Sequence, residues 1–161
     1  MKCLVFSDSH GNTRNMRQAL LSHPDAEVVF FLGDGLSDAD LVSSGDSGRA
    51  WLPVAGNCDF SPMFRDSFVK KTDAITLEGV RIAFTHGDLY GAKYGIGGLL
   101  SLAKEQGASL VLFGHTHEPL EKYVPTEESG VHLFNPGSIG AGSYGIILLT
   151  TKGILLSHGK I

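Results

Sequence analysis

The strongest constraint on the fold is a set of short, continuously apolar runs, each followed closely by a cluster of Gly, Asp, Asn or His residues. Continuous apolar runs of this length are typical of β-strands that are covered on both faces. The five runs are Lys2–Phe6, Val28–Leu32, Trp51–Val54, Arg81–Thr85 and Leu110–Phe113. Helix-like segments alternate with several of them, which predicts a mixed α/β domain with two sheets and helices outside.

Periodicity and capping residues place the helices between these strands. The expected helices are Arg14–Ser22, Asp38–Val42 with Ser37 as its cap, and Leu99–Glu105. After residue 130 the pattern changes to hairpin-forming strands. The expected later strands are Val131–Phe134, Tyr144–Thr150 and Ile154–His158. The segments Phe60–Asp73 and Pro119–Gly130 are interpreted as surface connections.

Length and composition limit the class of protein. A chain of 161 residues suits one domain, expected to span residues 1–161. The net charge of −4 and the lack of a basic stripe argue against a nucleic-acid partner. No apolar run approaches the roughly 18–20 residues that span a bilayer. The two cysteines, Cys3 and Cys58, do not make a disulfide framework. We therefore expect a soluble, cytoplasmic protein with no membrane partner.

Five polar clusters follow the apolar runs. They are Asp8-Ser9-His10, Gly33-Asp34-Gly35, Gly56-Asn57-Cys58-Asp59, His86-Gly87-Asp88 and Gly114-His115-Thr116-His117. Taken singly, each is compatible with an ordinary turn, helix cap or hydrogen-bonded histidine. In α/β folds, however, ligands gather beyond the carboxyl ends of strands. Imidazole and carboxylate groups together suit Mn, Zn, Fe, Ni or Co rather than Ca, so the set indicates a transition-metal site.

The ordered set D-x-H, G-D, G-N-x-D, H-G and G-H-x-H resembles the calcineurin-like metallophosphoesterase superfamily. In length the chain is similar to its small prokaryotic phosphodiesterase branch, which is related to the retromer vacuolar-sorting subunit. The resemblance runs from Asp8 to about Ser138 and implies a four-layer α/β/β/α sandwich with two mixed sheets. It also implies two divalent metal ions. Mn²⁺ is the expected metal, with Ni²⁺, Zn²⁺, Fe²⁺ or Co²⁺ as alternatives.

The resemblance also implies a role for each residue of the expected site. The first ion would be held by Asp8, His10 and His117, the second by Asn57, His86 and His115, and Asp34 would bridge them. These seven residues are also the expected catalytic residues. No other cofactor is expected.

The function implied is that of a hydrolase: a metal-dependent phosphoesterase, and more specifically a phosphodiesterase. It would cleave small phosphate esters by in-line attack of a hydroxide that bridges the two metals. One alternative is a non-catalytic scaffold or binding module on the same fold, and another is a nuclease. The complete ligand set favours catalysis, and the acidic balance disfavours a nuclease. The apolar Phe60–Val69 segment suits either a homo-oligomer contact or packing onto the core.

Three positions add detail to the resemblance. Cys58 stands where many members of the superfamily have a histidine, and Asp88 stands where many have a second one. A thiol is a weak hydrogen-bond donor, and we interpret Cys58 as a small, buried packing residue. Asp59 is expected to orient the ligands rather than bind metal. The loop Asn135–Ser138 resembles one that lies near the site in this branch.

Overall fold

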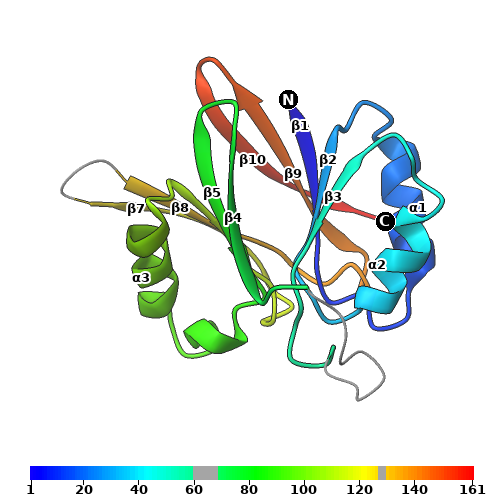
Figure 1. The fold of residues 1–161 in the computed structure, drawn as a ribbon, viewed down its shortest axis with the longest axis horizontal. Coiled ribbons are helices and arrows are strands. Elements are labelled where there is room, and N and C mark those ends of the chain that lie inside the picture. Colours follow the sequence, from blue (N-terminus) through cyan, green and yellow to red (C-terminus); the bar gives the residue numbers. More distant parts are fainter. Residues whose placement is uncertain (60–68, 127–129) are drawn as a thin grey trace.

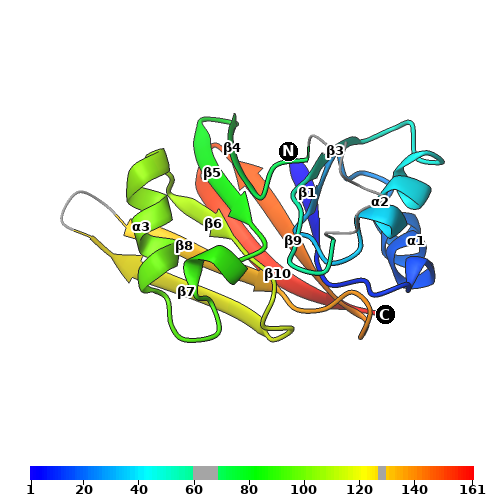
Figure 2. The same ribbon diagram turned by 60° about the horizontal axis from the view of Figure 1, so that its bottom comes forward.

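Two five-stranded mixed sheets pack face to face in the computed structural model, which describes residues 1–59, 69–126 and 130–161 (Figure 1). Helices α1 (Thr13–Ser22) and α2 (Leu36–Ser43) cover the outer face of one sheet. Helix α3 (Gly97–Gln106) covers the outer face of the other (Figure 2). The four-layer α/β/β/α order implied by the resemblance is therefore confirmed. Among the described residues, no helix is long and apolar enough to cross a membrane.

The first sheet has a parallel half and an antiparallel half. In spatial order its strands are β10 (Gly153–Lys160), β9 (Ser143–Thr150), β1 (Lys2–Phe6), β2 (Val28–Phe31) and β3 (Ala50–Pro53). Strands β1, β2 and β3 run parallel, and Val5 lies opposite Phe30. Strand β9 is antiparallel to both β1 and β10. The carboxyl ends of β1, β2 and β3 thus lie at the same edge.

The second sheet is also mixed. In spatial order its strands are β4 (Thr72–Leu77), β5 (Val80–Thr85), β6 (Leu110–Leu112), β8 (Gly130–Pro136) and β7 (Pro119–Pro125). Strands β5, β6 and β8 run parallel. A short 3₁₀-helix, η2 (Asp88–Tyr90), follows β5 and leads towards α3.

The core between the two sheets explains why the strands are continuously apolar. Phe30 and Phe134 are completely buried there, and Phe84 is almost so. The rings of Phe30 and Phe84 meet edge to face with centroids 5.2 Å apart. Because helices bury the outer faces as well, the central strands need apolar residues on both sides. Each fully buried Phe or Leu contributes roughly 1.5–3 kcal/mol relative to an exposed one.

Most expected elements agree with the structure to within one or two residues, but three interpretations were wrong. Pro119–Pro125 is strand β7 and not a connection. It is an edge strand, where proline is tolerated because the outer N–H groups need no partner. Thr72 and Asp73 open strand β4. Ser37 does not cap α2, whose N-cap is Gly35 without a side-chain cap. Residues 60–68, on which the oligomer expectation rested, lie outside the described residues.

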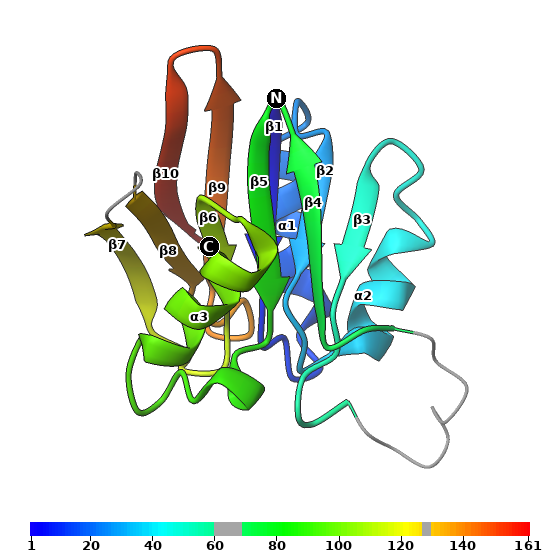
Figure 3. The ribbon, with the colours of Figure 1, turned by 60° about the vertical axis from the view of Figure 1, so that its left-hand side comes forward.

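The fold brings the polar clusters to one end of the sandwich. Figure 3 shows the connections after β1, β2 and β5 together at the lower edge of the two sheets. Backbone hydrogen bonds join the clusters there: Asp8 N donates to Gly33 O at 2.9 Å, and Gly114 N donates to His86 O at 2.9 Å. The parallel strands of both sheets therefore present their polar turns to a common site.

Candidate metal centre

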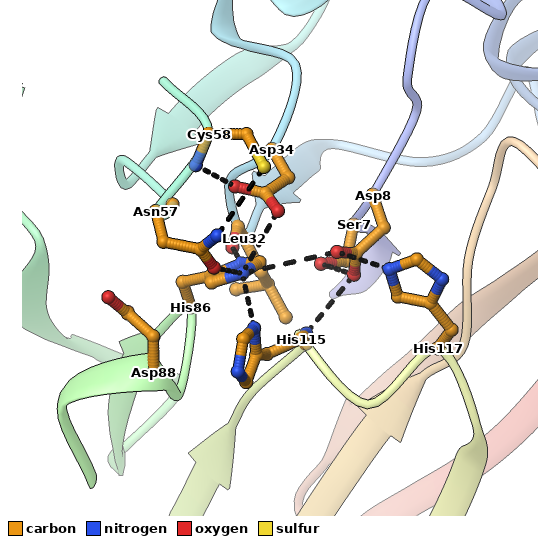
Figure 4. Close-up of polar contacts among 12 residues, drawn as sticks. Ser7, Asp8, Leu32, Asp34, Asn57, Cys58, His86, Asp88, His115 and His117 are labelled. Carbon is orange, nitrogen blue, oxygen red and sulfur yellow. Dashed lines mark hydrogen bonds and ion pairs between the residues drawn. The ribbon is translucent and has the colours of Figure 1, made fainter. Parts of the chain in front are cut away.

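All seven residues expected as metal ligands lie in turns that follow β1, β2, β3, β5 and β6. The six that Figure 4 labels point towards a common centre. The seventh, His10, is placed there by its contact with His117, whose Nε2 lies 3.4 Å from the Nε2 of His10. The site thus draws residues from 8 to 117 in the chain into a single cluster.

The first group of candidate ligands is Asp8, His10 and His117. The Nε2 atom of His117 lies 3.2 Å from Asp8 Oδ1. One ligand atom from each of the three residues lies within 4.8 Å of the others. Asp8 is completely buried, whereas His10 and His117 are exposed. This group therefore has one face in the protein and one face in solvent.

The second group surrounds the buried ring of His86. Its Nε2 lies 3.1 Å from Asn57 Oδ1, 3.1 Å from His115 Nδ1 and 3.4 Å from Asp34 Oδ2. Its Nδ1 donates to the carbonyl of Leu32 at 2.8 Å, which directs Nε2 into the site. Sequence reasoning did not foresee this carbonyl partner, since the chain offers no local signal for it.

Asp8 and Asp34 connect the two groups. Asp8, Asp34 and His86 also have ligand atoms within 4.8 Å of one another, and Asp8 Oδ1 lies 4.0 Å from His86 Nε2. Asp8 is therefore placed as centrally as Asp34, to which the resemblance gave the bridging role.

Backbone strain is concentrated at the same residues. Six non-glycine residues of the described chain have φ between 45° and 67°, and five of them are expected ligands: Asp8, His10, Asp34, His115 and His117. This left-handed conformation costs roughly 1–3 kcal/mol for a residue with a side chain and is frequent at functional sites. The sixth, Glu78, lies in the turn between β4 and β5.

The pKa shifts of His86, Asp34 and His115 are those expected where the surrounding groups favour a bound cation. Burial alone would lower the pKa of His86, but the hydrogen bond with Asp34 and the charge of Asp8 raise it above 6.5. Burial alone would raise the pKa of Asp34, but the hydrogen bonds with His86 and Cys58 hold it well below its ordinary value. Burial and then the charge of His86 lower the pKa of His115. The carboxylates of Asp8 and Asp34 thus favour a positive charge beside them.

One buried carboxylate oxygen of the ligand groups makes no hydrogen bond, although His117 Nε2 lies 3.2 Å from it. Asp8 Oδ1 makes no hydrogen bond, whereas Asp8 Oδ2 accepts from Ser7 Oγ and from the backbone N–H of His115. A buried carboxylate oxygen without a donor is costly, and a metal ion would satisfy it. Together with the imidazole nitrogens, this oxygen makes the donor set fit divalent transition metals.

Metal binding beside His86 should compete with protonation of this imidazole, whose pKa is raised in the fold. Because the pKa of His86 is raised in the fold, its protonation stabilises the metal-free protein fully below about pH 6.5. That contribution is lost as pH rises through the raised pKa, where metal affinity should increase. Calorimetric titration with Mn²⁺ in buffers of different ionisation enthalpy measures the proton release. A binding enthalpy independent of the buffer near neutral pH would contradict this exchange.

Asn135 holds the turn that carries His115 and His117. Its Nδ2 donates to Gly114 O at 2.9 Å and to Thr116 Oγ1 at 3.0 Å. Its Oδ1 accepts from the N–H of Gly137 at 2.9 Å. Asn135 is completely buried. The loop implied to lie near the site therefore does so, and it shapes the histidine turn.

The variant Asn135→Asp should weaken metal binding about 10–100-fold, the usual cost of losing a residue that supports a ligand. It keeps the side-chain shape but turns the donor towards Gly114 O into an acceptor. Asn15→Asp is the matched control, because Asn15 Nδ2 donates to Ile139 O outside the histidine turn. It should lower stability without changing metal affinity. Wild-type metal affinity in Asn135→Asp would show that this support is dispensable.

Two other residues flank the centre. Cys58 is exposed, which contradicts its interpretation as a buried packing residue. The backbone N–H of Cys58 nevertheless donates to Asp34 Oδ1 at 2.8 Å, which holds the turn beside the centre. Asp88 lies beside the Asn57–His115 edge (Figure 4), and its Oδ2 is 3.4 Å from Lys71 Nζ. Both positions therefore border the site without joining the ligand groups.

Comparison with known proteins decides the family. The sequence model of the calcineurin-like phosphoesterase superfamily domain matches residues 1–153. The chain belongs to this superfamily. A relative from Bacillus subtilis (strain 168), the probable metallophosphoesterase YsnB, is 32% identical over 139 residues, which cover 86% of this chain and 75% of that protein. The family assignment makes the protein a metal-dependent phosphoesterase, and its cluster of candidate ligands agrees with that activity.

Solved structures share the fold of this phosphoesterase over nearly its whole length. A Thermotoga maritima protein is 27% identical, with a TM-score of 0.70 over 99% of each chain. An archaeal phosphodiesterase is 21% identical, with a TM-score of 0.72 over 100% of each chain. Vps29 from Entamoeba histolytica, solved with zinc, is 17% identical, with a TM-score of 0.72 over 99% of each chain. The latter two likenesses establish the architecture alone.

Proposed function

We propose that the protein is a phosphodiesterase that hydrolyses small phosphate diesters with two divalent metal ions. The observation that carries the proposal is the convergence of all seven candidate ligands in one cluster, in which the buried Asp8 Oδ1 makes no hydrogen bond. Asp8, His10 and His117 would hold one ion, and Asn57, His86 and His115 the other. Asp34, with Asp8 beside it, would contact both.

The charge around the centre favours a diester over a monoester. A diester carries one negative charge near neutral pH, whereas a monoester carries between one and two. The described residues of the connections that carry the ligands include no arginine, and their lysines are Lys70, Lys71 and Lys93. Nearby Lys71 already contacts Asp88. Among the described residues, few cations are thus available for a second substrate charge. The archaeal phosphodiesterase of the same fold supports the same choice.

When bound, two divalent ions supply Lewis acidity that acidifies water and neutralises charge on the phosphoryl oxygens. The residues of the chain hold that chemistry in place. Ser7 and the N–H of His115 fix Asp8, and the carbonyl of Leu32 fixes His86. Because these supports are already made in the metal-free protein, little reorganisation is required on binding.

A small pocket gives access to the centre. It has a volume of about 260 Å³ and is lined by His10, Asp34, Cys58 and the first residues of α2. A pocket of this size suits a small ester rather than a polymer. Cys58 would therefore face the substrate, where it offers only a weak donor to a leaving group.

Chelator-treated protein supplied with Mn²⁺, Ni²⁺ or Zn²⁺ tests this function. We expect kcat/KM for bis-p-nitrophenyl phosphate to exceed that for p-nitrophenyl phosphate, and cleavage of single-stranded DNA to be much slower. His117→Ala should lose activity. His132→Ala is the matched control, because His132 packs on Tyr123 away from the centre. No hydrolysis with any divalent metal would favour the scaffold alternative, and rapid DNA cleavage would favour a nuclease.

A further inference from the structure

A single carboxylate connects two of the turns that carry candidate ligands. Asp59 Oδ2 accepts from the backbone N–H groups of Gly56 and Asp34, each at 2.8 Å. Asp59 Oδ1 accepts from the N–H groups of Gly35 at 2.8 Å and Leu36 at 2.9 Å. Each oxygen thus receives two donors, which leaves little capacity for a metal ion.

The two turns that Asp59 joins present Asp34 and Asn57. They follow the neighbouring parallel strands β2 and β3. The turns touch so closely that a Cβ on Gly56 would overlap Asp34 Oδ1. In addition, Cys58 N donates to the same oxygen of Asp34 at 2.8 Å. The spacing between Asp34 and Asn57 therefore depends on contacts that Asp59 and its neighbours make.

Asp59 also replaces the missing helix cap. The N-cap residue of α2, Gly35, has no side chain to accept the free N–H groups of the first turn. The carboxylate of Asp59 accepts two of these groups from 23 and 24 residues away in the sequence. A negative charge at this end of a helix is also favoured by the helix dipole. Removal of the Asp59 carboxylate would therefore release both the first turn of α2 and the Asp34 turn.

A second carboxylate, that of Asp38, supports the turn that carries Asp8 and His10. Asp38 Oδ2 accepts from Ser9 Oγ at 2.6 Å and from the N–H of Gly11 at 2.8 Å. Ser9 and Gly11 flank His10 in the first turn. The Asp38 carboxylate thus accepts from the turn that carries Asp8 and His10, and the Asp59 carboxylate accepts from the Asp34 and Asn57 turns. The two aspartates provide a matched pair for experiment.

We propose that Asp59 is a positioning residue that sets the distance between Asp34 and Asn57. It thereby maintains mainly the metal site beside His86, where both residues would be ligands, and to a lesser extent the other site, which would share only Asp34. This inference rests on the proposed two-metal function. Asp38 fixes the site formed by Asp8, His10 and His117 in the corresponding way. Loss of one aspartate should weaken mainly one of the two metal-binding events.

The test compares Asp59→Asn with Asp38→Asn by calorimetric titration with Mn²⁺, with Co²⁺ absorption spectra to report the coordination of each site. Asp59→Asn should weaken one binding event about 10–100-fold. Asp38→Asn should weaken the other. Amide hydrogen exchange in metal-free Asp59→Asn should show faster exchange at Gly35, Leu36 and Gly56. This last readout requires no metal, so it examines the hydrogen bonds directly.

Several results would overturn the inference. Wild-type metal affinities in Asp59→Asn would do so, as would unchanged exchange at the three amides. Equal weakening of both sites, in proportion to lost thermal stability, would reduce Asp59 to a general structural role. If Asp59→Asn does not fold, the same measurements are made on Asp59→Glu, which keeps the charge but displaces the carboxylate. If the wild-type protein itself binds no metal, that result contradicts the proposed two-metal function. The amide-exchange measurement still tests the hydrogen bonds of Asp59 separately.

Discussion

Replacing Asp34 by alanine should abolish tight binding of both metal ions and reduce phosphodiesterase activity by more than about a hundredfold. Loss of a residue that merely supports a ligand already costs about 10–100-fold. Asp34 is 4% exposed, lies 3.4 Å from His86 Nε2 and is grouped with Asp8. Its removal would take away a carboxylate that both ions share. Mass spectrometry of metal content and hydrolysis of bis-p-nitrophenyl phosphate measure the two effects.

Two further variants separate chemistry from folding. Asp34→Asn keeps an oxygen that can accept from the N–H of Cys58, so its fold should survive while metal binding remains impaired. Asp25→Ala removes a carboxylate that is 68% exposed and paired with Lys2, and it should change neither metal content nor activity. Two bound metals and full activity in Asp34→Ala would contradict the shared role of this carboxylate.

Adding Mn²⁺ to the metal-free protein should raise its melting temperature by roughly 5–10 °C at free metal about 100-fold above Kd. Such an excess adds about 2.7 kcal/mol of stability. In a domain of this size each kcal/mol shifts Tm by about 2–4 °C. The physical source is the buried cluster, in which Asp8 Oδ1 makes no hydrogen bond and two carboxylates lie close together. Differential scanning calorimetry measures the shift.

The choice of metal and variant makes this thermal test specific. Ca²⁺ prefers six to eight oxygen ligands, so a site rich in imidazole should give a much smaller shift. Asp34→Ala should show almost none. An equal shift with Ca²⁺, or in Asp34→Ala, would indicate that the ions bind elsewhere on the surface.

The positions of the site residues could be predicted because they depend on a simple rule. Asp8, Asp34, His86 and His115 each closely follow an apolar strand, and parallel strands bring such ends to one edge. The resemblance then supplied the expected division into two groups. Strand β1 and helix α1 agree with expectation because their periodicity and boundaries are local features of the sequence.

Features that depend on contacts between distant segments could not be predicted in this way. The left-handed φ of Asp8 and His115 reflects turns held by other strands. The cap of α2 comes from Asp59 and not from Ser37, because the carboxylate reaches Leu36 only after β3 packs beside β2. The predicted burial of Cys58 was wrong for a similar reason: residue type alone does not show whether a turn faces solvent.

Anomalous diffraction from crystals grown with Mn²⁺ tests the two-metal account most directly. Two peaks are expected, one in contact with Asp8, His10 and His117 and the other in contact with Asn57, His86 and His115. Asp34 should contact both. A single peak, or manganese bound away from these side chains, would contradict the account.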